Sequence, residues 1–308
     1  MTWSIKAWRA RAWIGMTVAM GFASMAMAAD KPTIWNGKVA PLATPWTAEV
    51  SPGNALPDYP RPQLARPSLE YPRWMSLNGL WQYAAADGRA APPFGQELKN
   101  SVLVPYPIES VLSGVQKHAD FMFYRRWVDV PADFTAHGQH VRLNFGAVAQ
   151  DATVYVNGKQ VARHTGGYTS FGADITQALR PHGPQEIVVA VHAPVDGANV
   201  MVGKQRLKPE GIFYTAASGI WQSVWLEPVP ATSLAQLTFT PARSLDAFTL
   251  TAKLQGVSGD ATLHVVAYAD GNAVGEASGP AGKPLRLAIR HPRLWSPADP
   301  FLYIFKAT

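Results

Sequence analysis

Residues 152–164, ATVYVNGKQVARH, contain the pattern that decides the fold class. Two β-prone runs flank Asn157 and Gly158, and a two-residue type I′ turn needs two residues that tolerate a positive φ. The stretch therefore predicts a β-hairpin with a tight turn at Asn157 and Gly158.

Similar short runs, each bounded by turn residues, lie on both sides of this hairpin. From residue 74 to 230 they read WMSLNGLWQYA, SVLVPYPI, FMFYRRWVDV, HVRLNFGAV, EIVVAVHA and GIWQSVWLEPV. In one run Val141, Leu143 and Phe145 alternate with polar or small residues, which indicates a half-buried strand. No stretch of any length has helical periodicity, and no βαβ nucleotide-binding pattern occurs. The block predicts a β-sandwich.

A second block of strands follows Pro228 and Pro230. Its runs read LAQLTFTPA, FTLTAKLQG, ATLHVVAYAD, NAVGEASG, PLRLAIRHP and FLYIFKAT, with frequent turn signals between them. Leu263, Val265 and Ala267 alternate with polar neighbours, as in a strand with one buried face. About six short strands in fewer than 80 residues are typical of an immunoglobulin-like sandwich. The apolar run from Phe301 to Lys306 is expected to be its closing strand.

The first 72 residues lack these strand patterns and contain a predicted signal and a proline-rich segment. Lys6 to Arg11 form a positive segment, Ile14 to Ala26 an apolar one, and Ala26-Met27-Ala28 fits a cleavage site, so residues 1–28 are predicted to be a secretory signal. Residues 29–72 hold nine of the 26 prolines, a density that excludes helix interiors and central strands. This segment is expected to be an extended arm over a neighbouring surface, with a disordered linker as the alternative.

Composition limits the possible functions. The chain is 47% hydrophobic and 16% charged, which fits a folded, strand-rich protein. Of the formal charge of +6, three units lie in the predicted signal, and no later stretch is a dense basic run. A solvated basic surface explains this charge better than nucleic-acid binding does. The chain has no cysteine, so its exported domains have no disulfide and no lipid anchor through a cysteine.

The familiar catalytic motifs do not occur. The sequence has no Gly-x-Ser-x-Gly elbow, and none of its Gly-Lys pairs is followed by the Ser or Thr of a P-loop. His137 and His140 are the closest pair of histidines, and nothing nearby completes a metal site. We therefore expect no cofactor, no metal, no nucleic acid and no membrane partner after signal cleavage.

Aromatic residues are the positive feature. Eight of the eleven tryptophans lie after the predicted signal, several of them at strand ends: Trp81, Trp127, Trp221 and Trp225. Sugar rings stack on such faces, but tryptophan and tyrosine also fill the cores of sandwiches, which is the simpler interpretation for each one.

Five motifs in series now point to a family. SLNGLWQY, VPYPIESVLSGV, FYRRWVDVP, ATVYVNGKQVARHTGGYTSFGADIT and SGIWQSVWLEPVP resemble the N-terminal part of the family 2 glycoside hydrolases, which include β-galactosidases and β-glucuronidases. The resemblance runs from about residue 57 to the last residue, and RLWSPADPFLY resembles the end of the family's second domain.

The resemblance implies an order of domains. In the family a jelly-roll sandwich and an immunoglobulin-like sandwich precede a (β/α)₈ barrel, which carries two catalytic glutamates that act with retention. Such a barrel needs about 250 residues. No unassigned segment of that size is left, and the Asn-Glu pair of the family's acid/base residue does not occur. The chain alone is therefore predicted to be inactive.

The resemblance also implies three sugar-binding candidates. Asp174, in GGYTSFGADIT, matches an aspartate that in β-glucuronidases reaches into the barrel's pocket; the alternative is a capping box with Gln177. Tyr214 lies in a segment that faces the active site in relatives, although simple packing also explains it. His118, in the loop before Phe121, is the third candidate.

The resulting prediction is an all-β protein without a catalytic barrel. Its domains are a signal (1–28), an arm (29–72), a jelly-roll sugar-binding-like domain (73–230) and an immunoglobulin-like sandwich (231–308). It is expected to be secreted or periplasmic, to brace the barrel of a β-glycoside hydrolase and to line one wall of its sugar pocket. The alternatives are a stand-alone carbohydrate-binding or adhesion module, and a barrel supplied by a separate chain.

Overall fold

The computed structural model describes residues 34–57, 73–88, 90–256 and 261–308. The predicted signal and residues 29–33 and 58–72 of the predicted arm lie outside the described residues. In the described part the regular structure consists of strands and five short 3₁₀ turns, which are η1 (Thr47–Glu49), η2 (Val111–Ser113), η3 (Ala132–Phe134), η4 (Ala136–Gly138) and η5 (Thr176–Ala178).

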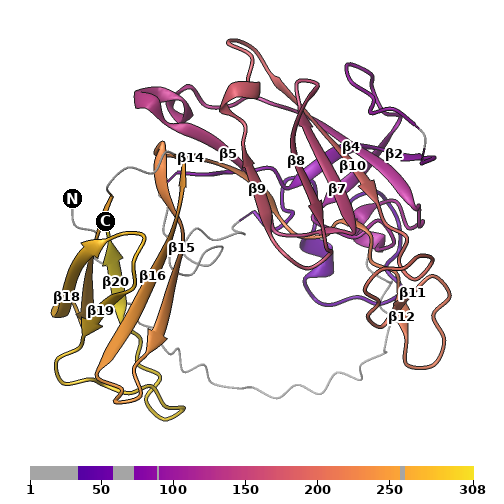
Figure 1. Cartoon of the computed structure of the whole chain (residues 1–308). Helices are drawn as coiled ribbons and strands as arrows, with labels where there is room; N and C mark the ends of the chain where they lie inside the picture. Colours follow the sequence, from indigo (N-terminus) through magenta and orange to yellow (C-terminus); the bar gives the residue numbers. More distant parts are fainter. Residues whose placement is uncertain (1–33, 58–72, 89, 257–260) are drawn as a thin grey trace, which may run out of the picture. The chain divides into compact units, whose positions relative to one another are not determined.

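The first sandwich is built from two main antiparallel sheets (Figure 1). The larger sheet has the order β3 (Asn100–Val104), β2 (Gly79–Ala86), β4 (Phe121–Val128), β10 (Gln185–His192), β7 (Asp151–Val156), β8 (Lys159–Thr165). The smaller has the order β1 (Met75–Ser76), β14 (Val224–Val229), β5 (His140–Phe145), β9 (Phe171–Asp174). Two strand pairs accompany them: β6 (Val148–Ala149) with β13 (Gly219–Ile220), and β11 (Gln205–Arg206) with β12 (Tyr214–Thr215).

Alternation of side chains along the strands creates the core between these two sheets. Trp81 of β2 and Tyr124 of β4 come from the larger sheet, and Leu143 of β5 comes from the smaller one, each with at most 1% of its surface exposed. The predicted alternation of Val141, Leu143 and Phe145 is confirmed, because all three point inward. Burial of this apolar surface is the main force that holds the sheets together.

The hairpin predicted at Asn157 and Gly158 is confirmed. β7 and β8 pair in antiparallel fashion, and the turn residues have φ values of +52° and +82°. These values are those of a type I′ turn, whose twist matches that of the two strands.

Pro228 lies inside β14, where the sequence suggested only the end of a block. It pairs with Val141 of β5 on one side, whereas β1 on the other side reaches only Trp225 and Leu226. A proline has no N–H to donate, so it is tolerated where one side of the strand has no partner.

The second sandwich has two sheets of three strands each (Figure 1). Their orders are β15 (Thr232–Pro241), β16 (Ala247–Gly256), β19 (Leu285–Ala288) and β18 (Asn272–Pro280), β17 (Thr262–Ala269), β20 (Ile304–Ala307). The predicted inward face of Leu263, Val265 and Ala267 is confirmed. The strand order is consistent with an immunoglobulin-like sandwich. The predicted fold class, two β-sandwiches in series, is confirmed, and the described residues contain no (β/α)₈ barrel.

The closing strand begins later than predicted, at Ile304 in place of Phe301. Ser296 and Asp299 exchange backbone hydrogen bonds in a turn, and Phe301 donates its N–H back to the Asp299 carbonyl. The Arg293 guanidinium stacks on the Phe301 ring at 4.3 Å. These local contacts hold Phe301 in the turn, so pairing with β17 starts only at Ile304.

Within the described part of the chain, no helix is long and apolar enough to cross a membrane.

Candidate functional site

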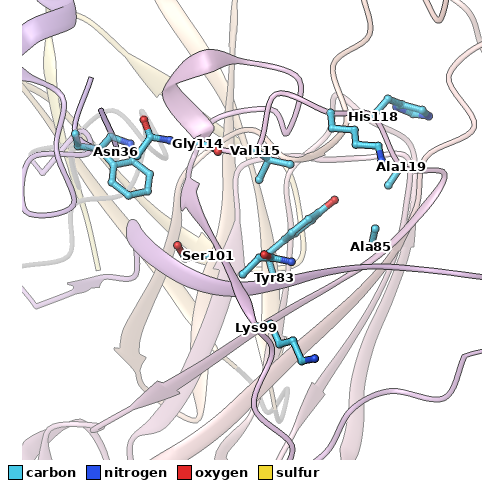
Figure 2. A pocket seen from close by; sticks show the side chains of 12 residues that line it. Asn36, Tyr83, Ala85, Lys99, Ser101, Gly114, Val115, His118 and Ala119 are labelled. Carbon is cyan, nitrogen blue, oxygen red and sulfur yellow. Dashed lines mark hydrogen bonds between the residues drawn. The ribbon is translucent and has the colours of Figure 1, made fainter. Parts of the chain in front are cut away.

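A pocket of about 580 Å³ opens at one end of the first sandwich (Figure 2). Four segments line it: the arm, the inner face of β2, the start of β3 and the loop that follows η2. Its lining includes Trp35, Tyr83, Lys99, Asn100, Lys117 and His118. Its size falls in the range of small-molecule sites, roughly 300–1,000 Å³.

The arm is fixed to the loop that forms one rim of the pocket. The Trp35 indole N–H donates to the Leu112 carbonyl at 3.0 Å, and the Lys38 ammonium donates to the Gly114 carbonyl at 2.6 Å. Gly114 has a φ of +83°, and a Cβ there would lie 2.7 Å from the Trp35 ring. Because glycine adopts this conformation freely and leaves room for the ring, the Trp35 side chain can close the rim.

Tyr83 forms the floor of the pocket. It lies on the inner face of β2 with 4% of its surface exposed, and its ring meets Tyr124 edge-on at 5.8 Å. Figure 2 shows its hydroxyl pointing into the pocket, and this hydroxyl has no hydrogen-bond partner among the described residues. Burial, with a smaller contribution from the Glu109 charge, raises the pKa of Tyr83 to about 12. The hydroxyl therefore stays protonated at neutral pH and can donate.

His118 lies at the edge of the pocket, held between two carboxylates. Its Nδ1 is 2.8 Å from Glu109 Oε1, and its Nε2 is 2.8 Å from Asp120 Oδ1. The other Glu109 oxygen accepts the Ser218 N–H at 2.9 Å. Only 6% of the Glu109 side chain is exposed, so these hydrogen bonds stabilise a buried charge and link the His118 loop to Ser218.

Asp174 lies at the end of β9, in a hydrogen-bonded turn. Its Oδ1 accepts from the Thr176 N–H at 2.9 Å and from the Thr176 hydroxyl at 2.5 Å, and its Oδ2 contacts His140 Nδ1. Burial raises the pKa of Asp174, but the hydrogen bonds from Thr176 and His140 lower it more, so it lies below its ordinary value.

The predicted capping box is wrong in its geometry. The residue that precedes η5 is Ile175, whose side chain cannot accept a hydrogen bond, and Asp174 instead accepts the N–H of Thr176, two residues further on. This is an Asx-type turn, which short acidic side chains form readily ahead of a 3₁₀ turn.

Tyr214 is in β12, with 60% of its surface exposed. Its N–H donates to the Lys204 carbonyl at 2.9 Å, and the Lys204 ammonium lies 5.6 Å from the centre of its ring. Tyr168 donates to Gln205, the residue that pairs with Tyr214, so this loop lies next to the β8–β9 connection.

Strand β10 separates Asp174 from the other two candidates. Asn157 binds the Ala178 carbonyl, four residues after Asp174, and also binds Glu186 at the start of β10. At the other end of β10, Ala193 donates to the Asp120 carbonyl, two residues after His118. An eight-residue strand is about 23 Å long.

The loop that carries Tyr214 belongs to the His118 end. Gln150 donates to the carbonyl of His192, the last residue of β10, and accepts from Gly166 just before Tyr168. Tyr168 in turn donates a hydrogen bond to Gln205, and Gln205 pairs with Tyr214. The structure thus places His118 and Tyr214 at one end of the sandwich and Asp174 at the other.

The tryptophans divide between core and surface. Trp81 and Trp225 are buried, as the simpler interpretation predicted. Trp127 is 40% exposed, with the Arg125 and Arg180 guanidinium groups over its ring, and Trp221 is half-buried and donates to the Gly167 carbonyl. None of these four lines the pocket of Figure 2.

Sequence reasoning missed Tyr83, Glu109 and the two lysines of the pocket. Tyr83 alternates with Trp81 on β2, so the pattern suggested only an inward, core position. Tyr83 lines a pocket only because the arm and the loop after η2 close over it. The hydrogen bonds between the arm and this loop join residues more than 70 positions apart in the sequence. Among the described residues, no group of three or more His, Asp or Glu side chains is arranged to hold a metal ion.

Comparison with known proteins agrees with this architecture. Residues 94–230 match the model of the sugar binding domain of glycosyl hydrolases family 2. A β-galactosidase of Thermoanaerobacter pseudethanolicus is 31% identical over 172 residues, which are 54% of this chain and 22% of the relative. A β-glucuronidase of Paenibacillus borealis is 24% identical over 264 residues, which are 74% of this chain and 41% of the relative.

A solved structure shares the fold. The β-glucuronidase of Faecalibacterium prausnitzii superposes with a TM-score of 0.61 and 26% identity, over 77% of this chain and 44% of that one. Residues 94–230 therefore match a sugar binding domain of the glycosyl hydrolases family 2, and the chain is similar to part of these β-galactosidases and β-glucuronidases. It spans less than half the length of each of these relatives.

Proposed function

We propose that the chain is the N-terminal portion of an exported β-glycoside hydrolase. In this proposal the two sandwiches brace a catalytic barrel, and one end of the first sandwich lines part of its sugar pocket. The match of residues 94–230 to the family's sugar binding domain carries the proposal. The names of the relatives, β-galactosidase and β-glucuronidase, support a parent activity on O-glycosidic bonds of β-glycosides.

The end of the sandwich that holds His118 and Tyr214 is the better candidate for this wall. Two of the three predicted sugar contacts lie there, and Tyr214 is exposed in a loop that also exposes Ile212 and Met201. Asp174 lies at the other end with both carboxylate oxygens already hydrogen-bonded, and its sugar contact stays a prediction.

A kinetic experiment tests the wall. In a product of the same gene that includes a barrel, Tyr214→Ala and His118→Gln are expected to lower kcat/KM by about tenfold, while Tyr303→Phe, in the second sandwich, leaves it unchanged. Unchanged kcat/KM in both site variants would exclude this end of the sandwich. Sequencing the DNA beyond codon 308 shows first whether such a product is encoded.

The alternative is a stand-alone exported carbohydrate-binding or adhesion module. The pocket over Tyr83 favours it, because its size of about 580 Å³ and its aromatic and polar lining suit a small ligand. A gene that ends at codon 308, together with sugar binding by the purified chain, would support this alternative over the hydrolase.

A further inference from the structure

We propose that the pocket over Tyr83 binds an acidic sugar, meaning a hydroxylated ring that carries a carboxylate or a sulfate group. The binding is a property of this chain alone, so the inference does not depend on the hydrolase activity proposed above.

The charge of the lining selects for an anion. Lys99 and Lys117 line the pocket together with His118, and no acidic residue does. Two carboxylates lie close by, those of Glu109 and Asp120, and both are hydrogen-bonded to the His118 ring. Two lysines among the lining residues give the pocket a positive potential, which attracts an anionic ligand more strongly than a neutral one.

The floor offers a hydrogen bond that the protein leaves unused. The Tyr83 hydroxyl is buried, points into the pocket in Figure 2 and has no partner among the described residues. A ligand oxygen can form a hydrogen bond with this hydroxyl, and the exposed Asn100 and Ser101 offer further polar contacts at the rim.

The apolar part of the pocket suits the carbon face of a sugar ring. Trp35 and Tyr83 supply aromatic surface, and Val115 and Ala85 supply aliphatic surface. The Trp35 ring is already held by its bond to Leu112, so little side-chain freedom is lost when a ligand binds. Aromatic walls with a few fixed polar groups are typical of small-ligand sites.

These features together favour a compact, charged, hydroxylated ligand over the alternatives. A neutral sugar would leave the two lysines unused, and a simple anion would leave the Tyr83 hydroxyl and the aromatic surface unused. The volume of about 580 Å³ accommodates one or two sugar rings.

Calorimetric titration of the purified chain tests the ligand class. The probes are sodium D-glucuronate, D-glucose 6-sulfate, D-glucose and sodium acetate, all at low ionic strength. At least one acidic sugar is expected to bind about tenfold more tightly than glucose and than acetate, because it alone uses both the lysines and the floor. Tighter binding of glucuronate than of the sulfate identifies a uronate site, and the reverse identifies a sulfated sugar. Equal affinity for glucose, or for acetate, overturns the proposal.

Variants locate the binding. The double variant Lys99→Gln/Lys117→Gln is expected to raise the Kd for the preferred acidic sugar about tenfold, and Lys283→Gln, an exposed lysine of the second sandwich, should leave it unchanged. Tyr83→Phe should raise the Kd about fivefold without lowering Tm, since it removes only an unpartnered hydroxyl. The pocket is not the binding site if the double lysine variant binds with unchanged affinity. The same conclusion follows if Tyr83→Phe has a Tm well below that of wild type but binds with unchanged affinity.

Discussion

The hydroxyl of Tyr124 occupies the space that a side chain at position 219 would need. A Cβ added to Gly219 would lie 1.9 Å from Tyr124 Oη. Tyr124 is buried in the core, and its hydroxyl accepts the N–H of Ile220 at 3.3 Å. Gly219 also has a φ of +84°. The glycine of the SGIW motif is therefore required both by its backbone conformation and by the tyrosine packed against it.

Gly219→Ala is expected to destabilise the first sandwich by about 3 kcal/mol or more, because the methyl group must displace a buried ring in a close-packed core. Gly158→Ala is the matched control: its φ is +82°, but nothing lies within 4 Å of the added methyl. That variant should cost only about 1 kcal/mol of backbone strain. Urea unfolding measures both, and equal losses would show that contact with Tyr124 contributes nothing.

The buried ion pair of Arg125 and Glu186 gives a second prediction. Arg125 Nε lies 2.6 Å from Glu186 Oε1, and both residues are at most 2% exposed. Arg125 also donates to Gln82, and Glu186 accepts the Gly95 N–H, so the pair connects β2, β4 and β10 with the loop before β3.

Removal of either partner leaves the other charge buried and unpaired, so Arg125→Met or Glu186→Leu should cost about 3–5 kcal/mol. The double variant should cost clearly less than the two single losses added together, because it leaves no uncompensated charge. Chemical denaturation of the four proteins measures this coupling. Strictly additive losses would mean that the ion pair does not stabilise the sheet.

The third prediction is that the contribution of Asp174 to the free energy of unfolding depends on pH. Asp174→Ala should cost about 1 kcal/mol at pH 7, since it removes the carboxylate that accepts the Thr176 N–H. The pKa of Asp174 is lowered in the folded state, so this stability is complete above the unfolded pKa, about 3.9, and is lost as the pH falls through the lower folded value.

The difference in unfolding free energy between wild type and Asp174→Ala should therefore shrink as the pH falls below about 4. Denaturant titrations at a series of pH values measure it, and Asp133→Ala, an exposed aspartate whose ion pair with Arg73 is on the surface, serves as the control. A free-energy difference that widens below about pH 4 would contradict the assigned direction of the shift.

Local patterns were sufficient to predict the longer strands, whereas the short strands β9, β11 and β12 were not predicted. The hairpin could be predicted because Asn157 and Gly158 both tolerate the positive φ of a two-residue turn. The buried face of Leu263, Val265 and Ala267 could be predicted because side chains alternate along a strand with a period of two. The start of the last strand was less predictable, because Phe301 is held by Arg293 eight residues earlier. That contact is invisible to a pattern of β-prone residues.

The candidate site was harder to predict because its contacts are long-range. Nothing in the sequence near Tyr83 indicates that Trp35 and the loop after η2 close over it. In the same way, the resemblance to a family suggested one site for Asp174, Tyr214 and His118, whereas β10 lies between Asp174 and the other two. Spacing along the chain carries no information about which end of a strand a loop returns to.

The predicted signal can be tested on exported protein. Cleavage after Ala28 should leave a mature chain that begins at Ala29 or close to it, because Ala26-Met27-Ala28 presents small residues at the cleavage site. N-terminal sequencing of protein from the periplasm or the medium measures this. A mature protein that begins at Met1 or retains Lys6 would refute the signal, and an Ala28→Pro variant that accumulates unprocessed would support it.

The purified chain is expected not to hydrolyse glycosides. Retaining hydrolysis needs two carboxyl groups about 5–5.5 Å apart across the scissile bond, one as nucleophile and one as general acid. In the pocket over Tyr83 the lining has no carboxylate, and the nearby Glu109 and Asp120 are hydrogen-bonded to His118. Aryl β-galactosides and β-glucuronides should therefore show no turnover above a blank, even where an acidic sugar binds. Sustained release that is abolished by Glu109→Gln or Asp120→Asn, and that is kept in Asp133→Asn, would overturn the assignment and place a catalytic site in the first sandwich.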